Sequence, residues 1–184
     1  ADSVQELFDW STAFAYQPLL QGNRIALVTN AGGPGVMATD ALERCGLVLA
    51  TLAPETEAAL QEVLPAAANI HNPVDVLGDA PADRYGVALD IVLKDPGVDG
   101  VLVILTPQSA TEIEATAEVL VERAKTATKP LLGCWMGEEK IVHGTRILAK
   151  NRVPSYPFPE RAVAAFGAMY RYWSWTQQPE TEIE

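Results

Sequence analysis

A glycine-rich stretch, AGGPG at residues 31–35, follows the apolar run RIALVT and precedes a sequence with helical periodicity. Backbone N–H groups at a helix start and the helix dipole both favour an anion, and glycines let a phosphate approach the backbone closely. The pattern therefore favours a phosphate or phosphorylated group held on that helix start. The same glycines could instead serve only a sharp turn and close packing of the helix on a sheet.

The stretch also fits the relaxed dinucleotide pattern G-x-G-x-x-G/A, with Gly33, Gly35 and Ala38 at the three small positions. That fingerprint also requires an acidic residue at the end of the next strand. The next apolar run, VLATLAPET, offers only Glu55 and Glu57, which come after a proline. The pattern alone is weak evidence for a nicotinamide or flavin dinucleotide.

A second polar stretch, TPQSAT at residues 106–111, follows the most apolar run of the chain and opens another helical pattern. Two capping boxes fit it, Ser109 with Glu112 and Thr111 with Glu114. Either box would satisfy backbone N–H groups at that helix start. These side chains therefore have a structural interpretation that needs no ligand.

The functional alternative places these hydroxyl and amide side chains against a ligand, across the sheet edge from the glycines. The glutamates put negative charge near the helix start, so any anion held there needs help from another part of the protein. On this interpretation the phosphate-facing residues are Asn30, Gly32, Gly33, Gly35, Thr106, Gln108, Ser109 and Thr111.

Other residue types with catalytic potential have structural interpretations. We expect His71 to form hydrogen bonds in a loop, His143 to lie on a helix surface, and Asp75 to bond loop backbone. Cys45 and Cys134 lie in separate apolar patterns, so we expect buried, reduced thiols. The spacings yield no Ser–His–Asp set and no cluster of metal ligands. We therefore expect neither a catalytic residue nor a metal site in this chain.

The elements that must position the two polar stretches alternate along the chain. Short apolar runs, typical of strands, cover residues 24–30, 47–52, 72–78, 98–106, 129–136 and 153–158. Helical patterns cover residues 3–16, 36–46, 55–64, 81–95, 111–127, 138–151 and 159–175. This alternation predicts an α/β fold with a mainly parallel sheet between two helix layers, in which ligands bind at the carboxyl ends of the strands.

Length and charge narrow the function. The chain has 184 residues, of which 48% are hydrophobic, so we expect one domain with a leading helix and connection at 1–22 and an acidic linker or tail at 177–184. A net charge of −11 disfavours nucleic acid and anionic membranes as partners. No apolar run is long enough to span a bilayer, and no signal peptide is evident, so we expect a cytoplasmic protein.

The last helical pattern contains four aromatic residues, Tyr170, Tyr172, Trp173 and Trp175. We expect them to pack against other helices, with a partner surface as the alternative.

Three segments in order carry a family resemblance: NRIALVTNAGGPGVMATDALE, then HNPVDVLGDAPADRYGVALDIVLKDPGVDGVLVILTPQ, then YPFPERAVAAFGAMYRY. Together they closely resemble one domain of the NDP-forming acyl-CoA synthetases, the ADP-forming acetate-CoA ligase family related to succinyl-CoA synthetase. The resemblance implies a flavodoxin-like domain. In that family, a CoA-binding Rossmann domain and a phosphohistidine domain precede this domain, and an ATP-grasp domain follows it.

The resemblance implies a reaction in which carboxylate, CoA and NTP give acyl-CoA, NDP and phosphate through acyl phosphate and phosphohistidine. The family's Ser-His-Thr-Gly type motif and its ATP-grasp residues are absent from this sequence. CoA, ATP or ADP and Mg²⁺ are therefore implied for the parent enzyme, and none for this domain alone. By the same analogy, Gly32, Gly33, Gly35 and the stretch 106–111 face the phosphohistidine loop of the neighbouring domain.

Two alternatives remain open from the sequence. The same domain string occurs in bacterial protein lysine acetyltransferases, where it is catalytically degenerate and senses a ligand. A stand-alone flavodoxin-like module that binds a nucleotide is the other alternative, since the glycine pattern permits it.

Overall fold

The computed structural model describes residues 1–178, where strands and helices alternate as the sequence predicts. The strands are β1 (Arg24–Thr29), β2 (Val48–Leu49), β3 (Val74–Asp75), β4 (Gly100–Leu105), β5 (Leu131–Trp135) and β6 (Ser155–Tyr156). The helices are α1 (Val4–Tyr16), α2 (Gly32–Arg44), α3 (Pro54–Val63), α4 (Ala82–Val92), α5 (Ile113–Ala124), α6 (Val142–Lys150) and α7 (Pro159–Thr176), with the 3-10 helix η1 (Glu138–Ile141) before α6. Of the expected tail, only residues 177 and 178 are described, directly after α7.

The strands form one sheet in the order β2-β1-β4-β5-β6, and all strand pairs are parallel. β2 pairs with the start of β1 at Arg24 and Ile25, and β3 pairs with its end at Val28 and Thr29. Because β4 occupies the other edge of β1, β2 and β3 lie end to end along one edge. With β3 set aside, the order is the 2-1-3-4-5 order of flavodoxin-like folds, so the predicted fold class is confirmed.

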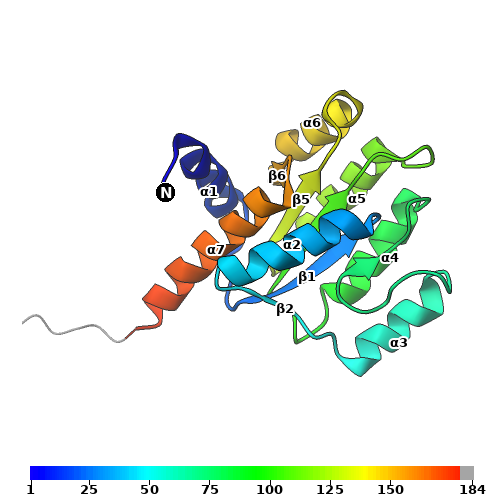
Figure 1. Ribbon diagram of the computed structural model, residues 1–184, viewed down its shortest axis with the longest axis horizontal. Coiled ribbons are helices and arrows are strands. Elements are labelled where there is room, and N and C mark those ends of the chain that lie inside the picture. The colour runs from blue at the N-terminus through cyan, green and yellow to red at the C-terminus, as the bar shows by residue number, and fades with distance from the viewer. Residues whose placement is uncertain (179–184) are drawn as a thin grey trace, which may run out of the picture.

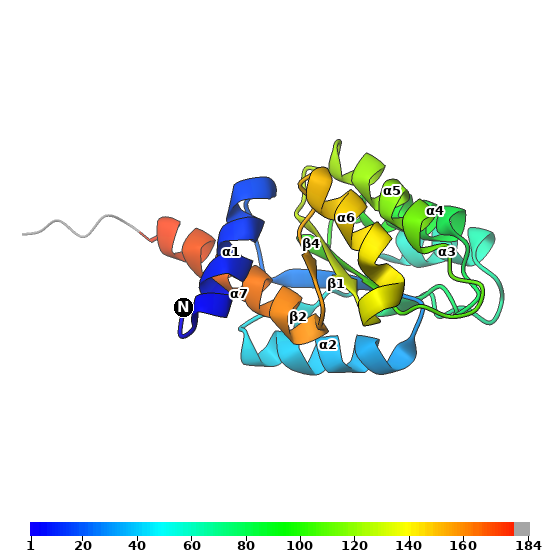
Figure 2. The ribbon, with the colours of Figure 1, turned by 90° about the horizontal axis from the view of Figure 1, so that it is seen from above.

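Helices cover both faces of the sheet in three layers (Figures 1 and 2). α3, α4, α5 and α6 pack on one face, and α1, α2 and α7 pack on the other. Along β4, Val101 and Val103 belong to the first core, whereas Leu102 and Ile104 belong to the second. Because both faces of the strands are buried, they appear in the sequence as unbroken apolar runs.

The side chain of Asn72 links β1 to the segment that follows β2. Its amide oxygen accepts a hydrogen bond from the N–H of Leu27 at 2.9 Å. Its amide nitrogen donates to the carbonyl oxygens of Ile25 and Ala50, each at 2.9 Å. Asn72 therefore stabilises β1 at Ile25 and Leu27, where the pairing with β2 ends and before the pairing with β3 begins.

The cysteines and histidines have structural surroundings. Burial raises the pKa of the Cys134 thiol to about 12 and also raises the pKa of Cys45, which is only half-buried rather than buried as expected. His71 lies in a loop with its Nδ1 2.7 Å from Oε1 of Glu57. His143 is exposed on α6, as expected. These positions agree with the structural roles that the sequence suggests for the histidines.

The aromatic side chains of α7 divide into two groups. Tyr170 and Trp173 are half-buried and stack with ring centroids 6.1 Å apart, as expected for helix packing. Tyr172 packs edge-on against Phe14 of α1, as expected for helix packing, but is still 48% exposed, and Trp175 is 66% exposed. The physical reason is that the last turns of α7 run past the sheet, beyond Met169, its last buried residue (Figure 1).

Candidate functional site at the carboxyl edge of the sheet

The glycine-rich segment forms the first turn of α2, not a loop in front of it. The helix begins at Gly32, four residues before the predicted start. Among residues 1–178, the glycines with positive φ are Gly46 and Gly137, so Gly32, Gly33 and Gly35 do not adopt a left-handed backbone conformation. β1 before this turn and the rest of α2 after it hold the backbone in place. This tertiary context overrides the low helix propensity of glycine.

The three glycines of α2 have different surroundings. Gly32 and Gly33 are exposed, and a Cβ at Gly33 would meet no atom of the described residues within 4 Å. Gly35 is buried, and a Cβ there would lie 3.5 Å from Thr29 and 3.6 Å from Pro73. Gly35 therefore serves helix-to-sheet packing, whereas Gly32 and Gly33 present backbone to the outside.

No side chain among the described residues caps the start of α2 through a hydrogen bond. Its N-cap residue, Ala31, donates its own N–H to Oγ1 of Thr29 at 3.0 Å. The N–H groups of a first helical turn have no partner within the helix, and Pro34 has no N–H to offer. The backbone N–H groups of Gly32 and Gly33 are therefore the donors that this helix start can present to an anion.

Asn30 and Thr106 join the two polar stretches. The Asn30 side chain is buried, with 2% of the residue exposed. It donates to the carbonyl oxygen of Thr106 at 2.8 Å and accepts from the N–H and Oγ1 of Thr106 at 2.9 and 3.2 Å. The structure therefore places these two predicted residues together, and their mutual hydrogen bonds support the edge from inside.

The predicted capping boxes at the start of α5 are wrong. The N-cap of α5 is Glu112, and no side-chain capping hydrogen bond is formed there within the described part of the chain. Oγ1 of Thr111 accepts from the N–H of Gln108 at 2.8 Å and closes its own loop. The carboxylate of Glu112 accepts from the N–H of Ala82 at 2.9 Å and so binds the start of α4. Sequence spacing suggested local partners, but the fold brings a nearer partner from another helix.

Gln108 packs against a neighbouring loop rather than standing free. Its amide group lies 3.0 to 3.1 Å from the position that a Cβ of Gly78 would take. Gly78 follows β3, so the loop after β3 and the loop after β4 touch at this point. Ser109 is exposed beside them. Gly78 ends the apolar run at 72–78, and no sequence pattern pairs it with Gln108.

A family model described as "Ligase-CoA domain" matches residues 25–178. The chain belongs to the Ligase-CoA domain family. An acetate–CoA ligase [ADP-forming] of Archaeoglobus fulgidus is 41% identical over 172 residues, which are 94% of this chain and 24% of that protein. A 4-hydroxybutyrate–CoA ligase [ADP-forming] of Nitrosopumilus maritimus is 36% identical over 182 residues, which are 99% of this chain and 26% of that protein.

A solved structure agrees with these matches. A dinucleotide-forming acetyl-coenzyme A synthetase of Candidatus Korarchaeum cryptofilum, solved in complex with phosphate and ADP, superposes with a TM-score of 0.86 at 31% identity. The superposition covers 98% of this Ligase-CoA domain and 40% of that chain. The domain thus spans between about a quarter and two fifths of the length of these relatives.

Acidic groups lie beside both helix starts of the Ligase-CoA domain. Oδ2 of Asp75 is 3.8 Å from the position that a Cβ of Gly32 would take, and Oδ1 of Asp75 accepts from the N–H of Leu77 at 2.9 Å, as expected for a residue that bonds loop backbone. Arg84 is near this edge but is paired with Asp79 at 2.8 Å. Negative charge opposes an anion at a helix start. An anion held at this edge therefore needs positive charge or hydrogen-bond donors besides the first N–H groups of α2.

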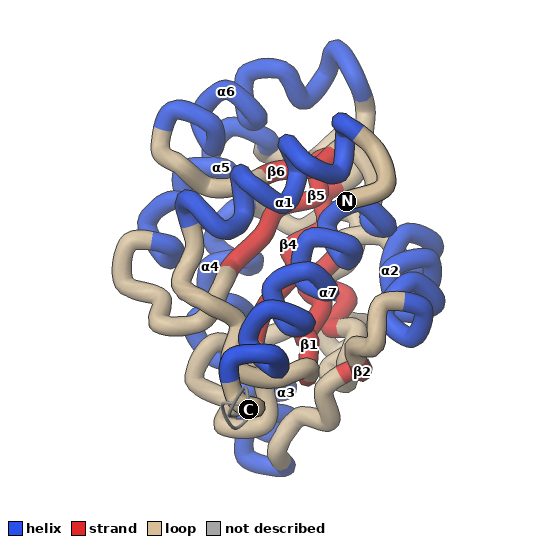
Figure 3. Tube along the Cα trace, turned by 90° about the vertical axis from the view of Figure 1, so that its left-hand side faces the viewer, coloured by secondary structure: helices blue, strands red, loops and turns tan. Residues whose placement is uncertain are grey.

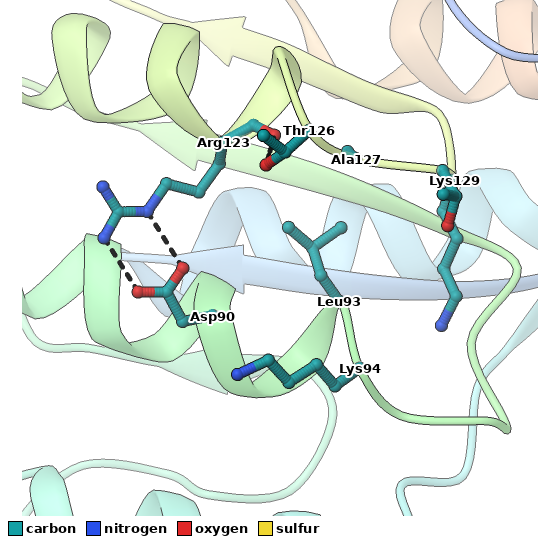
Figure 4. Close-up of a pocket in the computed structure, with 8 residues that line it drawn as sticks. Asp90, Leu93, Lys94, Arg123, Thr126, Ala127 and Lys129 are labelled. Carbon is teal, nitrogen blue, oxygen red and sulfur yellow. Dashed lines mark hydrogen bonds and ion pairs between the residues drawn. The ribbon is translucent and has the colours of Figure 1, made fainter.

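A cavity of about 210 Å³ lies elsewhere, between the ends of α4 and α5 (Figure 4). Its lining includes the Asp90–Arg123 ion pair, with Lys94 and Lys129 on the other side. Lys129 precedes β5, so this cavity is at the amino edge of the sheet, opposite the predicted site. Its volume is below the roughly 300 Å³ at which ligand pockets begin. We therefore assign no function to it.

Two further findings bear on partners. Within residues 1–178, no group of three or more His, Cys, Asp or Glu side chains is placed to hold a metal ion. None of the helices described there combines the length and apolar character needed to cross a membrane.

Proposed function

We propose that this Ligase-CoA domain is one domain of an NDP-forming acyl-CoA synthetase. The proposed reaction converts carboxylate, CoA and NTP into acyl-CoA, NDP and phosphate through acyl phosphate and phosphohistidine. Within it, this domain is a scaffold and the phosphate-facing part of a composite site. The observation that carries the proposal is that almost the whole chain matches only about a quarter of the length of the two ADP-forming acyl-CoA ligases described above.

The geometry of the carboxyl edge supports the phosphate-facing role. Gly32 and Gly33 expose the first backbone N–H groups of α2, and the Asn30–Thr106 bonds hold this helix start in a fixed relation to the loop before α5. Such groups stabilise a phosphoryl group only where other donors and cations complete the site. Because Asp75 lies beside Gly32, we assign those completing groups to a neighbouring domain.

The implied small molecules belong to the rest of the proposed assembly. We assign CoA to a CoA-binding domain, the histidine to a phosphohistidine domain, and ATP or ADP with Mg²⁺ to an ATP-grasp domain. The residues described here offer no cluster of metal ligands that would place Mg²⁺ in this domain. A cytoplasmic location is part of the same proposal.

A direct assay tests the proposal. The 184-residue chain and the complete gene product that contains it, with any partner subunit, are each incubated with acetate or a short-chain acid, CoA and ATP. Acyl-CoA formation and transfer of label from γ-labelled ATP to protein are measured. We expect turnover and labelled protein from the complete product, and neither from the chain alone. In the chain, His71 is paired with Glu57 in a loop and His143 lies on the surface of α6.

Either of two results contradicts the proposal. The first is turnover, or label on His71, in the 184-residue chain. The second is a complete gene product that binds acyl-CoA, makes none and carries an acetyltransferase domain, which is the outcome expected for a ligand-sensing relative. The His71→Ala variant of the chain is the control for labelling at that residue.

A further inference from the structure

The outward face of α1 is apolar, whereas its inward face contains a carboxylate. Val4, Leu7 and Phe8 are 70%, 55% and 65% exposed. Asp9 is only 9% exposed and accepts two hydrogen bonds from Arg161, each at 2.7 Å. Ala13 and Trp10 pack into the core on the inward side, so α1 has apolar residues on both of its faces, whereas a surface helix is expected to be polar on the outward face.

The apolar face continues onto the end of α7. Phe14, on the same side of α1, packs edge-on against Tyr172 with ring centroids 5.7 Å apart, and Tyr172 lies 6.0 Å from Trp175. Figure 3 shows α1 and α7 together on one face of the molecule. The exposed side chains that make up this α1–α7 patch are Val4, Leu7, Phe8, Phe14, Tyr172 and Trp175.

The patch is held in place by polar contacts on the inner side of α1. Besides the Asp9–Arg161 pair, the hydroxyl of Tyr156 donates to the carbonyl oxygen of Asp9 at 2.9 Å. At the other end of the helix, the side chain of Gln17 accepts from the N–H of Leu131 at 2.8 Å. A fixed helix that presents several large apolar side chains on neighbouring turns is typical of a protein interface.

The occupant follows from the length of the relatives and the position of the two ends. The matched relatives are about two and a half to four times as long as the segment they share with this chain, so most of each relative lies beyond one end of that segment or the other. Both the start of α1 and the end of α7 are on the face that carries the patch (Figures 1 and 3). Whichever end continues, it leaves from this face and tethers its domain beside the patch, which raises the effective concentration of that domain.

We propose that the α1–α7 patch is the surface on which another folded domain of the same synthetase packs, through an apolar surface of its own. This rests on the proposed function, because it assumes that the chain is part of such an assembly. A second copy of this chain fits less well, because two chains of net charge −11 would repel each other.

The test uses the double variant Leu7→Ser/Phe8→Ser and a control, Val63→Ser/Val87→Ser, at exposed positions on α3 and α4. Each pair is made in the 184-residue chain and in the complete gene product with any partner subunit. In the complete product, we expect the patch variant to lower the melting temperature by about 5 °C or more and to speed hydrogen exchange in α1. In the chain alone, the patch variant should melt within about 2 °C of the parent, because serine replaces side chains that water already surrounds. The control should change neither protein.

Three results would overturn the proposal. One is a complete product in which the patch variant behaves like the control. Another is a 184-residue chain that dimerises with rising concentration in sedimentation, if Leu7→Ser/Phe8→Ser abolishes that dimer. The third is a gene product with no other folded domain or subunit. Acyl-CoA synthesis is measured in parallel. If the proposed function is wrong, the wild-type product will make no acyl-CoA. The difference in α1 hydrogen exchange between the patch variant and the wild type still tests the interface in that case.

Discussion

Asn30 and Thr106 share three hydrogen bonds across the sheet edge, so the segment before α2 and the segment before α5 are held as one unit. Each residue directly follows a strand, Asn30 after β1 and Thr106 after β4, and these strands are neighbours in the sheet. The carboxyl ends of neighbouring parallel strands meet at one edge, and ligands of such folds bind there. These three bonds thus fix the geometry of the proposed phosphate-facing surface.

We expect Asn30→Ala to lower the free energy of unfolding by about 2–4 kcal/mol, because the backbone N–H and carbonyl of Thr106 lose buried partners. Urea unfolding of the chain measures the change. The control is Asn151→Ala, since the exposed Asn151 side chain bonds only the carbonyl oxygen of Ile147 among described contacts. It should cost less than about 1 kcal/mol. Equal effects of the two variants would show that the Asn30–Thr106 bonds do not stabilise the edge.

The sequence predicted the fold class and the longer strands β1, β4 and β5 because the sheet is buried on both faces. The strands β2, β3 and β6 have only two residues each, fewer than the apolar runs that predicted them. Runs such as 100–105 are apolar at every position, which only a strand covered by two helix layers requires. The sequence did not predict that α2 begins at Gly32, because local propensity places glycine outside helices. The sequence also predicted that Glu112 would cap the start of its own helix, α5. In the structure its carboxylate accepts a hydrogen bond from the N–H of Ala82 in α4, and only the fold brings these two helices together.

The exposed side chains show a second limit. The aromatic residues of α7 share a helical pattern, yet only the contacts made by the fold separate the half-buried Tyr170 from the exposed Tyr172. In α1, hydrophobic residues lie on both sides of the helix, so periodicity alone could not show which side packs inward. The pairing of Asp9 with Arg161, distant in sequence, decides it.

Acid should destabilise the domain through two aspartates near the amino edge. Burial alone would raise the pKa of Asp95, but hydrogen bonds, including those from the N–H groups of Ala53 and Gly97, outweigh it and lower that pKa below 3.8. Burial is likewise outweighed at Asp99, where the side-chain and backbone bonds from Arg24 lower the pKa. A lowered folded-state pKa gives stability that is present above the unfolded value and is lost as pH falls through the folded value.

We therefore expect the free energy of unfolding to fall as pH drops from about 5 to below 3.8. Urea unfolding at a series of pH values across this range measures the free energy of unfolding. Asp99→Asn should be less stable than the parent at neutral pH and should approach it at the acid end, because the charged form no longer contributes there. Asp40→Asn, at an exposed position on α2, should run parallel to the parent. A constant difference between Asp99→Asn and the parent at all pH values would contradict the assignment.

The attachment of α1 should depend on Arg161. Arg161→Met keeps a long side chain but leaves the Asp9 carboxylate unpaired, so we expect a loss of about 2 kcal/mol and faster hydrogen exchange in α1. The control, Arg123→Met, breaks the exposed pair with Asp90 and should cost less than about 1 kcal/mol. Unchanged exchange in α1 of Arg161→Met would mean that apolar contacts alone hold the helix.

Dinucleotides should not bind to the glycine segment. Gly33, Gly35 and Ala38 all lie inside α2, and the residues that follow β2, Ala50 and Thr51, include no acidic group for a ribose. Titration of the chain with NADH, FAD or FMN, followed by fluorescence, should show no saturation at micromolar concentrations. A micromolar dissociation constant, about −8 kcal/mol, would favour a nucleotide-binding module instead.

The decisive variant for the carboxyl edge is Gly33→Val. A Cβ at this position meets nothing within the described residues, and Gly33 lacks a positive φ, so valine fits the fold and stability should change by less than about 1 kcal/mol. In the complete synthetase, however, the added side chain stands where a phosphoryl group would approach the first N–H groups of α2. We expect acyl-CoA formation and label transfer to histidine to fall roughly 10-fold or more, equivalent to about 1.4 kcal/mol in the barrier.

The control is Ala149→Val. Ala149 is exposed near the end of α6, away from this edge, so this variant should retain parental rates. If Gly33→Val also retains them while folding normally, the glycine segment serves helix packing alone.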